Sequence, residues 1–191
     1  MTTHVPEAPN TVRTARLEMM AMNLATIEAE LAGPEILSAL LGVAVPVSWP
    51  PGEFDRDAML YFQRCLQDSS AENAGWYGWY AFRISPGGQR LGLVGSAGYL
   101  GPPVAGSVEI GYSVIPEARN QGIATECVRA LVERAFSFPQ VSCVVAQTRD
   151  DTNVASTKVL LGCGFRRIGA GSEPGLVRYQ RERAATTPGL H

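Results

Sequence analysis

Apolar and polar residues alternate in some segments and follow a helical period in others, so the chain predicts a mixture of strands and helices. Alternation and short apolar runs predict strands at 14–19, 76–84, 91–100, 107–114, 141–148, about 165–169 and 175–182. Helical spacing predicts helices at 24–32, 34–41, from Asp55 to about Leu66, after Gly122, and at about 154–162. Three successive antiparallel strands followed by a β-α-β crossover indicate the α+β class, with a mostly antiparallel central sheet flanked by helices.

The length of 191 residues, 46% of them hydrophobic, predicts a single domain. We expect it to span residues 12–183, between flexible termini at 1–11 and 184–191. Sixteen basic and eighteen acidic residues, with no basic run, argue against a nucleic-acid partner. The sequence offers neither a signal peptide nor the roughly 20 apolar residues of a membrane helix, so we expect no membrane partner and a cytoplasmic location.

The histidines and cysteines exclude several kinds of chemistry. His4 and His191 lie in the terminal segments, where neither is well placed to activate a nucleophile. The four cysteines are isolated in sequence, without the paired spacing of a metal site, so we expect no metal. They are predicted to be small apolar residues without disulfides: Cys65, Cys127, Cys143 and Cys163.

The segment from Val114 to Glu126 carries the clearest chemical signal. A strand ends there, a short polar loop follows, and a helix begins directly after Gly122. The first turn of a helix presents unpaired N–H groups and the positive end of the helix dipole, while Gly122 and Ala124 allow a ligand to approach the backbone. A pyrophosphate fits this description. The alternative is that Pro116 and Gly122 only form a tight strand-to-helix turn.

These residues resemble the GNAT superfamily of acyl-CoA-dependent N-acetyltransferases, and within it the RimJ/RimL-like branch. The superfamily signature Gln/Arg-x-x-Gly-x-Gly/Ala corresponds to 119–124. It follows the strand that ends at Val114, and Pro116 lies between the two. Downstream, the stretch from Asn153 to Phe165 resembles the branch's Asn-x-x-Ser…Gly-Phe segment, and 14–17 resembles its opening strand. The resemblance extends from 14 to 182, although 20–75 matches only in outline. It implies a GNAT-like mixed sheet with a β-α-β cofactor-binding crossover.

The resemblance also implies acetyl-CoA as co-substrate and assigns residues to it. The backbone of Gln121 to Thr125 would hold the pyrophosphate, and Ser113 to Ile115 would run beside the pantetheine arm. The N–H of Val114 would lie near the thioester carbonyl, where such a donor stabilises an oxyanion. Asn153 would contact the pantetheine. The full predicted set is Ser113, Val114, Ile115, Arg119, Asn120, Gln121, Gly122, Ile123, Ala124, Thr125, Asn153 and Ser156.

Direct acetyl transfer needs a base for the attacking amine and an acid for the leaving thiolate. Glu109 shares a strand face with Ser113 and is the predicted base, directly or through water; the alternative is an ordinary solvent-facing carboxylate. Many GNAT members have a tyrosine that serves as the general acid at the position where this chain has Leu160. In RimL-like members a serine that matches Ser156 is a candidate acid, and its alternative role is helix capping or packing. Tyr112 and Tyr99 are further candidate donors.

Together these features predict an N-acetyltransferase that transfers acetyl from acetyl-CoA to a primary amine by direct attack in a ternary complex. The acceptor would be a protein N-terminus or a small molecule, and the enzyme could act as a homodimer. The loop from Val45 to Phe54, with the rest of 20–75, would form the acceptor side. The alternative is a catalytically silent acyl-CoA-binding regulatory module, which binds acetyl-CoA without turnover.

Overall fold

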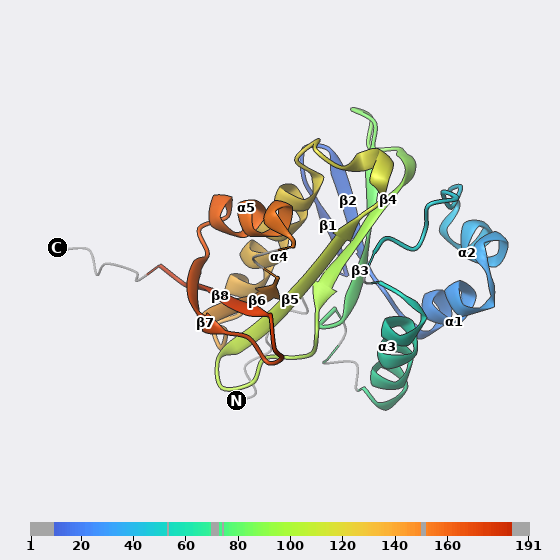
Figure 1. The fold of residues 1–191 in the computed structure, drawn as a ribbon. Coiled ribbons are helices and arrows are strands. Elements are labelled where there is room, and N and C mark those ends of the chain that lie inside the picture. Colours follow the sequence, from blue (N-terminus) through green and yellow to red (C-terminus); the bar gives the residue numbers. More distant parts are fainter. Residues whose placement is uncertain (1–9, 53, 70–72, 74, 150–151, 185–191) are drawn as a thin grey trace, which may run out of the picture.

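The computed structural model describes residues 10–52, 54–69, 73, 75–149 and 152–184. Within these ranges eight strands form one sheet, in the order β1-β2-β3-β4-β5-β6-β8-β7 (Figure 1). The strands are β1 (Thr11–Arg13), β2 (Leu17–Ala21), β3 (Gly78–Ile84), β4 (Arg90–Tyr99), β5 (Ser107–Val114), β6 (Cys143–Thr148), β7 (Arg166–Ala170) and β8 (Val177–Glu182). The helices are α1 (Leu24–Ala32), α2 (Pro34–Leu41), α3 (Arg56–Asp68), α4 (Ile123–Ser137) and α5 (Val154–Gly162), with a short 3-10 turn η2 (Pro116–Ala118).

The pairing of the strands confirms the predicted α+β class. Neighbouring strands from β1 to β5 are antiparallel, as are β6 with β8 and β8 with β7. Among the strands of the described ranges, β5 and β6 are the one parallel pair, and α4 makes the crossover between them. The sheet is therefore mixed and mostly antiparallel, with the predicted β-α-β unit at its centre.

Helices cover both faces of the sheet, which gives the molecule two apolar cores. In Figure 1, α4 and α5 lie on one face and α1, α2 and α3 on the other. The larger core lies under α4, where Val128, Leu131 and Val132 pack on the sheet. The smaller core packs α1 to α3 against Tyr80 and Phe82 of β3. The apolar side of α4 thus packs on one face of the sheet, and those of α1, α2 and α3 pack on the other.

The predicted helices begin where the sequence offers caps. Asn23 forms a capping box at α1, because its side chain accepts from the Thr26 N–H. Pro34 occupies the first turn of α2, and Gly42 ends that helix in the left-handed conformation. The Asp55 side chain accepts from the Ala58 N–H at α3, and Asn153 caps α5 in the same way.

The beginning of the chain differs from the prediction. The first strand was expected at 14–19, but β2 spans Leu17–Ala21 and an additional strand, β1, pairs with it. Thr14 to Arg16 form the turn between the two strands, because these residues hydrogen-bond to Glu126, far along the chain. The predicted flexible termini, 1–11 and 184–191, lie largely outside the described residues.

Three further observations concern the excluded chemistry. None of the helices in the described ranges is long and apolar enough to cross a membrane. A search of the same residues finds no group of three or more His, Cys, Asp or Glu side chains that could hold a metal ion. All four cysteines are free; burial is as predicted for Cys127 and Cys163, whereas Cys65 and Cys143 are only partly buried.

Candidate functional site

The sheet opens between β5 and β6. The two strands pair from Ser107 opposite Cys143 to Ile110 opposite Ala146, and the pairing stops there. Beyond this point Gly111–Val114 pairs only with β4, while β6 continues beside β8. A gap therefore crosses the centre of the sheet, bordered on one side by the last four residues of β5.

The backbone of β5 turns hydrogen-bonding groups into this gap. The Glu109 carbonyl accepts from the Leu100 N–H at 3.0 Å, and the Ile115 N–H donates to the Val94 carbonyl at 3.1 Å. Because bonding directions alternate along an antiparallel strand, the N–H and carbonyl of Tyr112 and Val114 point away from β4, toward the gap. The Val114 N–H can thus donate a hydrogen bond to a ligand in the gap.

Directly after β5, a compact loop leads into α4. Asn120 has φ +57° and Gly122 has φ +76°, so two left-handed residues reverse the chain over a short distance. Gly122 is the N-cap of α4, and no side chain caps this helix end. The first-turn N–H groups of α4 therefore point outward at the carboxyl end of β5, as the sequence predicted for an anion site.

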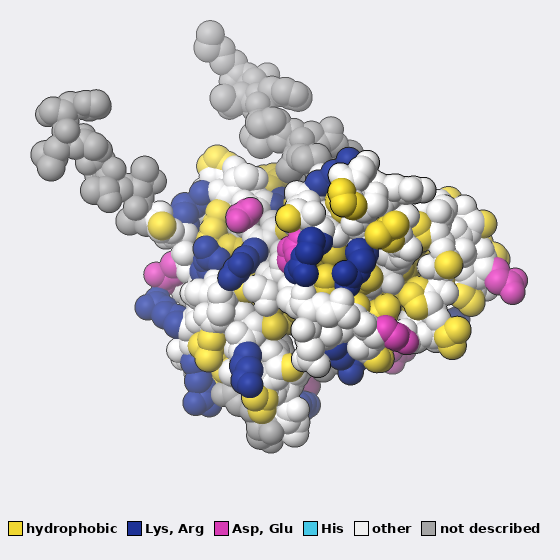
Figure 2. Space-filling model, turned by 90° about the horizontal axis from the view of Figure 1, so that it is seen from above, with side chains coloured by type: hydrophobic (Ala, Val, Ile, Leu, Met, Phe, Trp, Pro, Cys, Tyr) yellow, Lys and Arg dark blue, Asp and Glu magenta, His cyan; other side chains and the backbone are white. Residues whose placement is uncertain are grey.

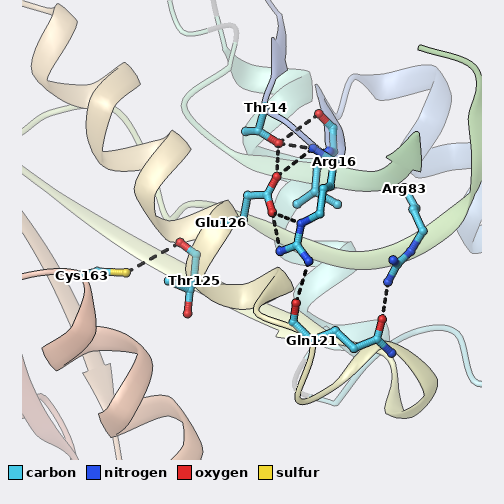
Figure 3. Close-up of polar contacts among 8 residues, drawn as sticks. Thr14, Arg16, Arg83, Gln121, Thr125, Glu126 and Cys163 are labelled. Carbon is cyan, nitrogen blue, oxygen red and sulfur yellow. Dashed lines mark hydrogen bonds and ion pairs between the residues drawn. The ribbon is translucent and has the colours of Figure 1, made fainter. Parts of the chain in front are cut away.

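A polar network holds this loop in place (Figure 3). The Glu126 carboxylate in the first turn of α4 accepts from Thr14 Oγ1 at 2.5 Å and from the Arg16 N–H at 3.0 Å. Arg16 also forms an ion pair with Glu126 at 2.6 Å, and its Nη1 donates to the Gln121 carbonyl at 2.9 Å. Burial alone would raise the pKa of Glu126, but the hydrogen bonds from Thr14 and Arg16 lower it. The β1–β2 turn thereby fixes the start of α4.

The same end of the molecule carries several arginines. Figure 2 shows it from above, with more Lys and Arg than Asp and Glu side chains on the surface in view. Arg83 Nη2 donates to Gln121 Oε1 at 2.6 Å, and Arg119 Nε donates to the Val114 carbonyl at 3.1 Å. Both of these acceptors are neutral, and the exposed Glu117 carboxylate is also close enough to Arg119 to interact with its charge. Positive charge beside a helix N-terminus suits a phosphate-bearing ligand.

On the α5 side of the gap, two hydroxyl groups meet. Tyr112 Oη and Ser156 Oγ are 2.7 Å apart, within hydrogen-bonding distance. Asn153 Oδ1 accepts from the Ser156 N–H at 3.1 Å, so the predicted cap of this helix is observed. These three residues line a cavity of about 300 Å³. Burial raises the pKa of the Tyr112 hydroxyl to about 12, which keeps it protonated at neutral pH.

On the opposite side of the gap, Glu109 faces a second cavity of about 520 Å³, between α3 and strands β4 and β5. Gln147 Nε2 donates to Glu109 Oε1 at 2.8 Å, and Gln147 Oε1 accepts from the Ser172 N–H at 2.6 Å. Gln147 therefore connects the Glu109 carboxylate to the β7–β8 connection. Both cavities are lined by Gly111 and Tyr112, so they meet at the gap in the sheet.

The predicted site residues fall into three groups around β5. Residues 113–115 and 119–125 form the strand end, the loop and the first turn of α4; Ile123 is buried, so only its backbone can reach a ligand. Asn153 and Ser156 lie across the gap from them, and Glu109 lies at the second cavity. The β5–α4 connection places the first group and the β6–α5 connection places the second, whereas Glu109 lies within β5 itself.

Neither Tyr99 nor Leu160 can serve as a proton donor at the gap. The Tyr99 hydroxyl donates to the Leu131 carbonyl at 2.7 Å in the core beneath α4, so the prediction of Tyr99 as a further donor is wrong. Leu160, which occupies the position of the usual GNAT tyrosine, is fully buried. Of the candidate hydroxyl donors, Ser156 and Tyr112 are the pair that meets at the gap.

The sequence reasoning missed the residues that support the site. Arg16, Arg83 and Glu126 hold the loop, and Gln147 holds Glu109. Among these residues, the sequence singled out Arg16 alone, through its place in the opening-strand motif at 14–17. The other three contact Gln121, Thr14 and Glu109, respectively, and each of these contacts spans more than 30 residues of sequence, so no local pattern reveals them.

Comparison with known proteins agrees with this geometry. A family model described as "Acetyltransferase (GNAT) domain" matches residues 26–166. The chain is 26% identical over 155 residues to the uncharacterized N-acetyltransferase YjdG of Bacillus subtilis (strain 168); the match covers 81% of this chain and 88% of the relative.

Two solved structures share the fold. The microcin C7 self-immunity acetyltransferase MccE, in complex with acetyl-CoA and AMP, aligns with a TM-score of 0.61 at 16% identity, over 93% of this chain and 98% of that one. The ribosomal L7/L12 alpha-N-protein acetyltransferase RimL, in complex with coenzyme A, aligns with a TM-score of 0.56 at 18% identity, over 90% and 97%. From the family match and the geometry of the site, we conclude that this chain belongs to the GNAT family of acyl-CoA-dependent acetyltransferases.

Proposed function

We propose that the protein transfers an acetyl group from acetyl-CoA to a primary amine by direct attack in a ternary complex. The observation that carries this proposal is the gap between β5 and β6, which ends at the uncapped N-terminus of α4. One ligand can lie along the free edge of β5 with its phosphates on the helix, while a second enters from the cavity beside Glu109.

The residues of the loop fit the phosphates of acetyl-CoA. In the proposal, the backbone N–H groups of Gln121 to Thr125 hold the pyrophosphate, with Arg119 and Asn120 beside it. A Cβ added to Gly122 would lie 3.4 Å from Arg16 Nη2, the nearest heavy atom, so the ligand side of this residue is open. The pantetheine arm would run along Ser113 to Ile115, near Asn153 and Ser156.

Acetyl-CoA supplies an activated thioester, and the chain's residues supply the donors and acceptors of the reaction. The Val114 N–H stabilises the negative charge that develops on the carbonyl oxygen during attack. Glu109 takes a proton from the substrate ammonium, directly or through a water molecule, so that the neutral amine can attack. Ser156, hydrogen-bonded to Tyr112, donates a proton to the sulfur as the carbon–sulfur bond breaks. The nitrogen loses its second proton as the amide forms, and this proton restores the Ser156 hydroxyl. Products are the acetylated amine and free coenzyme A.

Three finer statements belong to the same proposal. The likeness to RimL, a ribosomal L7/L12 alpha-N-protein acetyltransferase, supports placing the chain in the RimJ/RimL-like branch. A cytoplasmic location stays a prediction. A homodimer also stays a prediction, and sedimentation analysis of the purified chain tests it.

The test of the proposal is a calorimetric titration of acetyl-CoA followed by an amine panel, with free coenzyme A measured as product. We expect one binding site per chain and turnover of at least one amine. Glu109→Gln and Ser156→Ala should keep binding and lose most turnover, whereas Glu133→Gln, on an exposed face of α4, should keep both. Absence of binding refutes the site. Binding without turnover of any amine would instead favour the silent acyl-CoA-binding module.

A further inference from the structure

The cavity of about 520 Å³ beside Glu109 has a chemical character that restricts the acceptor. It lies on the face of the sheet that α1, α2 and α3 cover, and its size is within the range of small-molecule sites. Because it opens onto Gly111 and Tyr112 at the gap, an amine in this cavity would approach the part of the gap in which the proposed acetyl group lies.

The charge of the cavity is negative. Asp57, in the first turn of α3, and Glu109, on β5, both line it, and none of the described residues that line it is Lys, Arg or His. Asp57 is exposed, and Glu109 is half-buried and held by Gln147. A cleft with one sign of charge concentrates ligands of the opposite sign. An ammonium group is therefore attracted to this cavity, and a carboxylate on the same ligand is repelled.

The wall on the α3 side is aromatic. The ring centroids of Phe54 and Phe62 are 6.2 Å apart, and those of Tyr61 and Phe62 are 5.6 Å apart. Leu176, from the β7–β8 connection, also lines the cavity. Tyr61 Oη donates to the Leu100 carbonyl at 2.8 Å, which ties α3 to the end of β4 and fixes the width of the cavity. This wall suits an apolar body, and aromatic faces also attract cations.

We propose that the acceptor is a small primary amine on an apolar or aromatic body, with no carboxylate beside the amine. This inference rests on the proposed function, because it names the substrate class of the same site. It separates amines and amino-acid amides, which the cavity accepts, from free amino acids, whose carboxylate would face Asp57 or Glu109. It also separates acceptors with a large apolar group from small polar amines such as ethanolamine.

The experiment compares phenylalanine amide with phenylalanine, since this pair differs at the carboxylate alone. Each value of kcat/KM is corrected for the fraction of unprotonated amine at the assay pH. We expect the amide to exceed the free acid by at least thirtyfold, and to exceed alanine amide by at least tenfold. Asp57→Asn should reduce the preference for the amide threefold or more, whereas Asp68→Asn, at the far end of α3 and outside the cavity lining, should leave it unchanged.

A binding measurement gives a second readout without turnover. In the presence of coenzyme A, the phenylethyl-trimethylammonium cation should bind and the 3-phenylpropanoate anion should not, and Asp57→Asn should weaken binding of the cation. Equal or faster acetylation of the free amino acid, or preferred binding of the anion, overturns the inference and leaves the proposed function standing. Failure of every amine to be acetylated overturns both.

Discussion

Replacing Gly122 by leucine tests whether the start of α4 holds the cofactor phosphates. Gly122 has φ +76°, and an L-residue in this conformation costs about 1–2 kcal/mol. The chain offers a matched control in Gly42, which ends α2 with φ +69° and has no atom within 4 Å of an added Cβ. Gly122→Leu and Gly42→Leu should therefore lose similar stability, and urea unfolding measures this loss.

The two variants should differ in affinity for acetyl-CoA. At Gly122 the leucine side chain would fill the space in front of the first-turn N–H groups of α4. Loss of two hydrogen bonds to a charged phosphate amounts to roughly 3–6 kcal/mol, or about 10²- to 10⁴-fold in Kd. Gly42→Leu should bind like the wild type, because α2 is remote from this loop (Figure 1).

The measurement is a calorimetric titration of acetyl-CoA into each variant at a temperature where both remain folded. The reasoning is refuted if Gly122→Leu binds as tightly as Gly42→Leu while showing the same loss of stability. That result would mean that the loop from Arg119 to Ala124 is a tight turn and that the phosphates bind elsewhere.

The remaining predictions concern the residues that support the site. Glu126→Ala should lower the free energy of unfolding by about 2 kcal/mol, because the β1–β2 turn loses its charged acceptor. The folded-state pKa of Glu126 is below the usual 4.5, so its carboxylate stabilises the fold fully above pH 4.5, and this stabilisation is lost as the pH falls through the folded-state pKa. The difference in free energy of unfolding between wild type and Glu126→Ala, measured in urea, should therefore be smaller at pH 3 than at pH 7. Gln147→Leu should lower kcat about tenfold and leave the KM for acetyl-CoA unchanged, because Gln147 orients Glu109; an equal change in both would contradict this positioning role. Tyr112→Phe should lower kcat about tenfold if its hydroxyl assists Ser156, and the wild-type rate should show no loss from tyrosine ionisation below pH 10; retained kcat would remove Tyr112 from the reaction.

The sequence predicted the elements whose causes are local. Gly122 at the start of α4, Asn153 at the start of α5 and Asp55 at the start of α3 are caps, and a cap acts on residues within one turn. The β5-loop-α4 segment could be predicted for the same reason, since a strand end, a left-handed glycine and a helix start are all within about ten residues. The local structure of the proposed cofactor side could therefore be predicted from the sequence.

The errors have long-range causes. The turn at Thr14 to Arg16 replaces the first residues of the expected strand because Glu126, more than a hundred positions away, accepts its hydrogen bonds. Tyr99 was a candidate donor, but the sheet places it under α4, where its hydroxyl donates a hydrogen bond to the Leu131 carbonyl. Alternation tells which residues share a face and not which helix covers that face.

The acceptor side depends most on such contacts. The loop at 45–54 has no period that predicts a conformation, yet Ser48 Oγ donates to Glu117 Oε2 at 2.7 Å, beside the cofactor loop. Trp49 Nε1 donates to Glu30 Oε1 at 2.5 Å, and a Cβ on Gly52 would lie 2.7 Å from Ser113 Oγ. The loop is thus held between α1 and the end of β5, with Phe54 at the cavity. In the proposed site, backbone groups hold the cofactor while this loop and α3 hold the acceptor, so we expect substitutions in 45–62 to change the preferred amine without changing the cofactor.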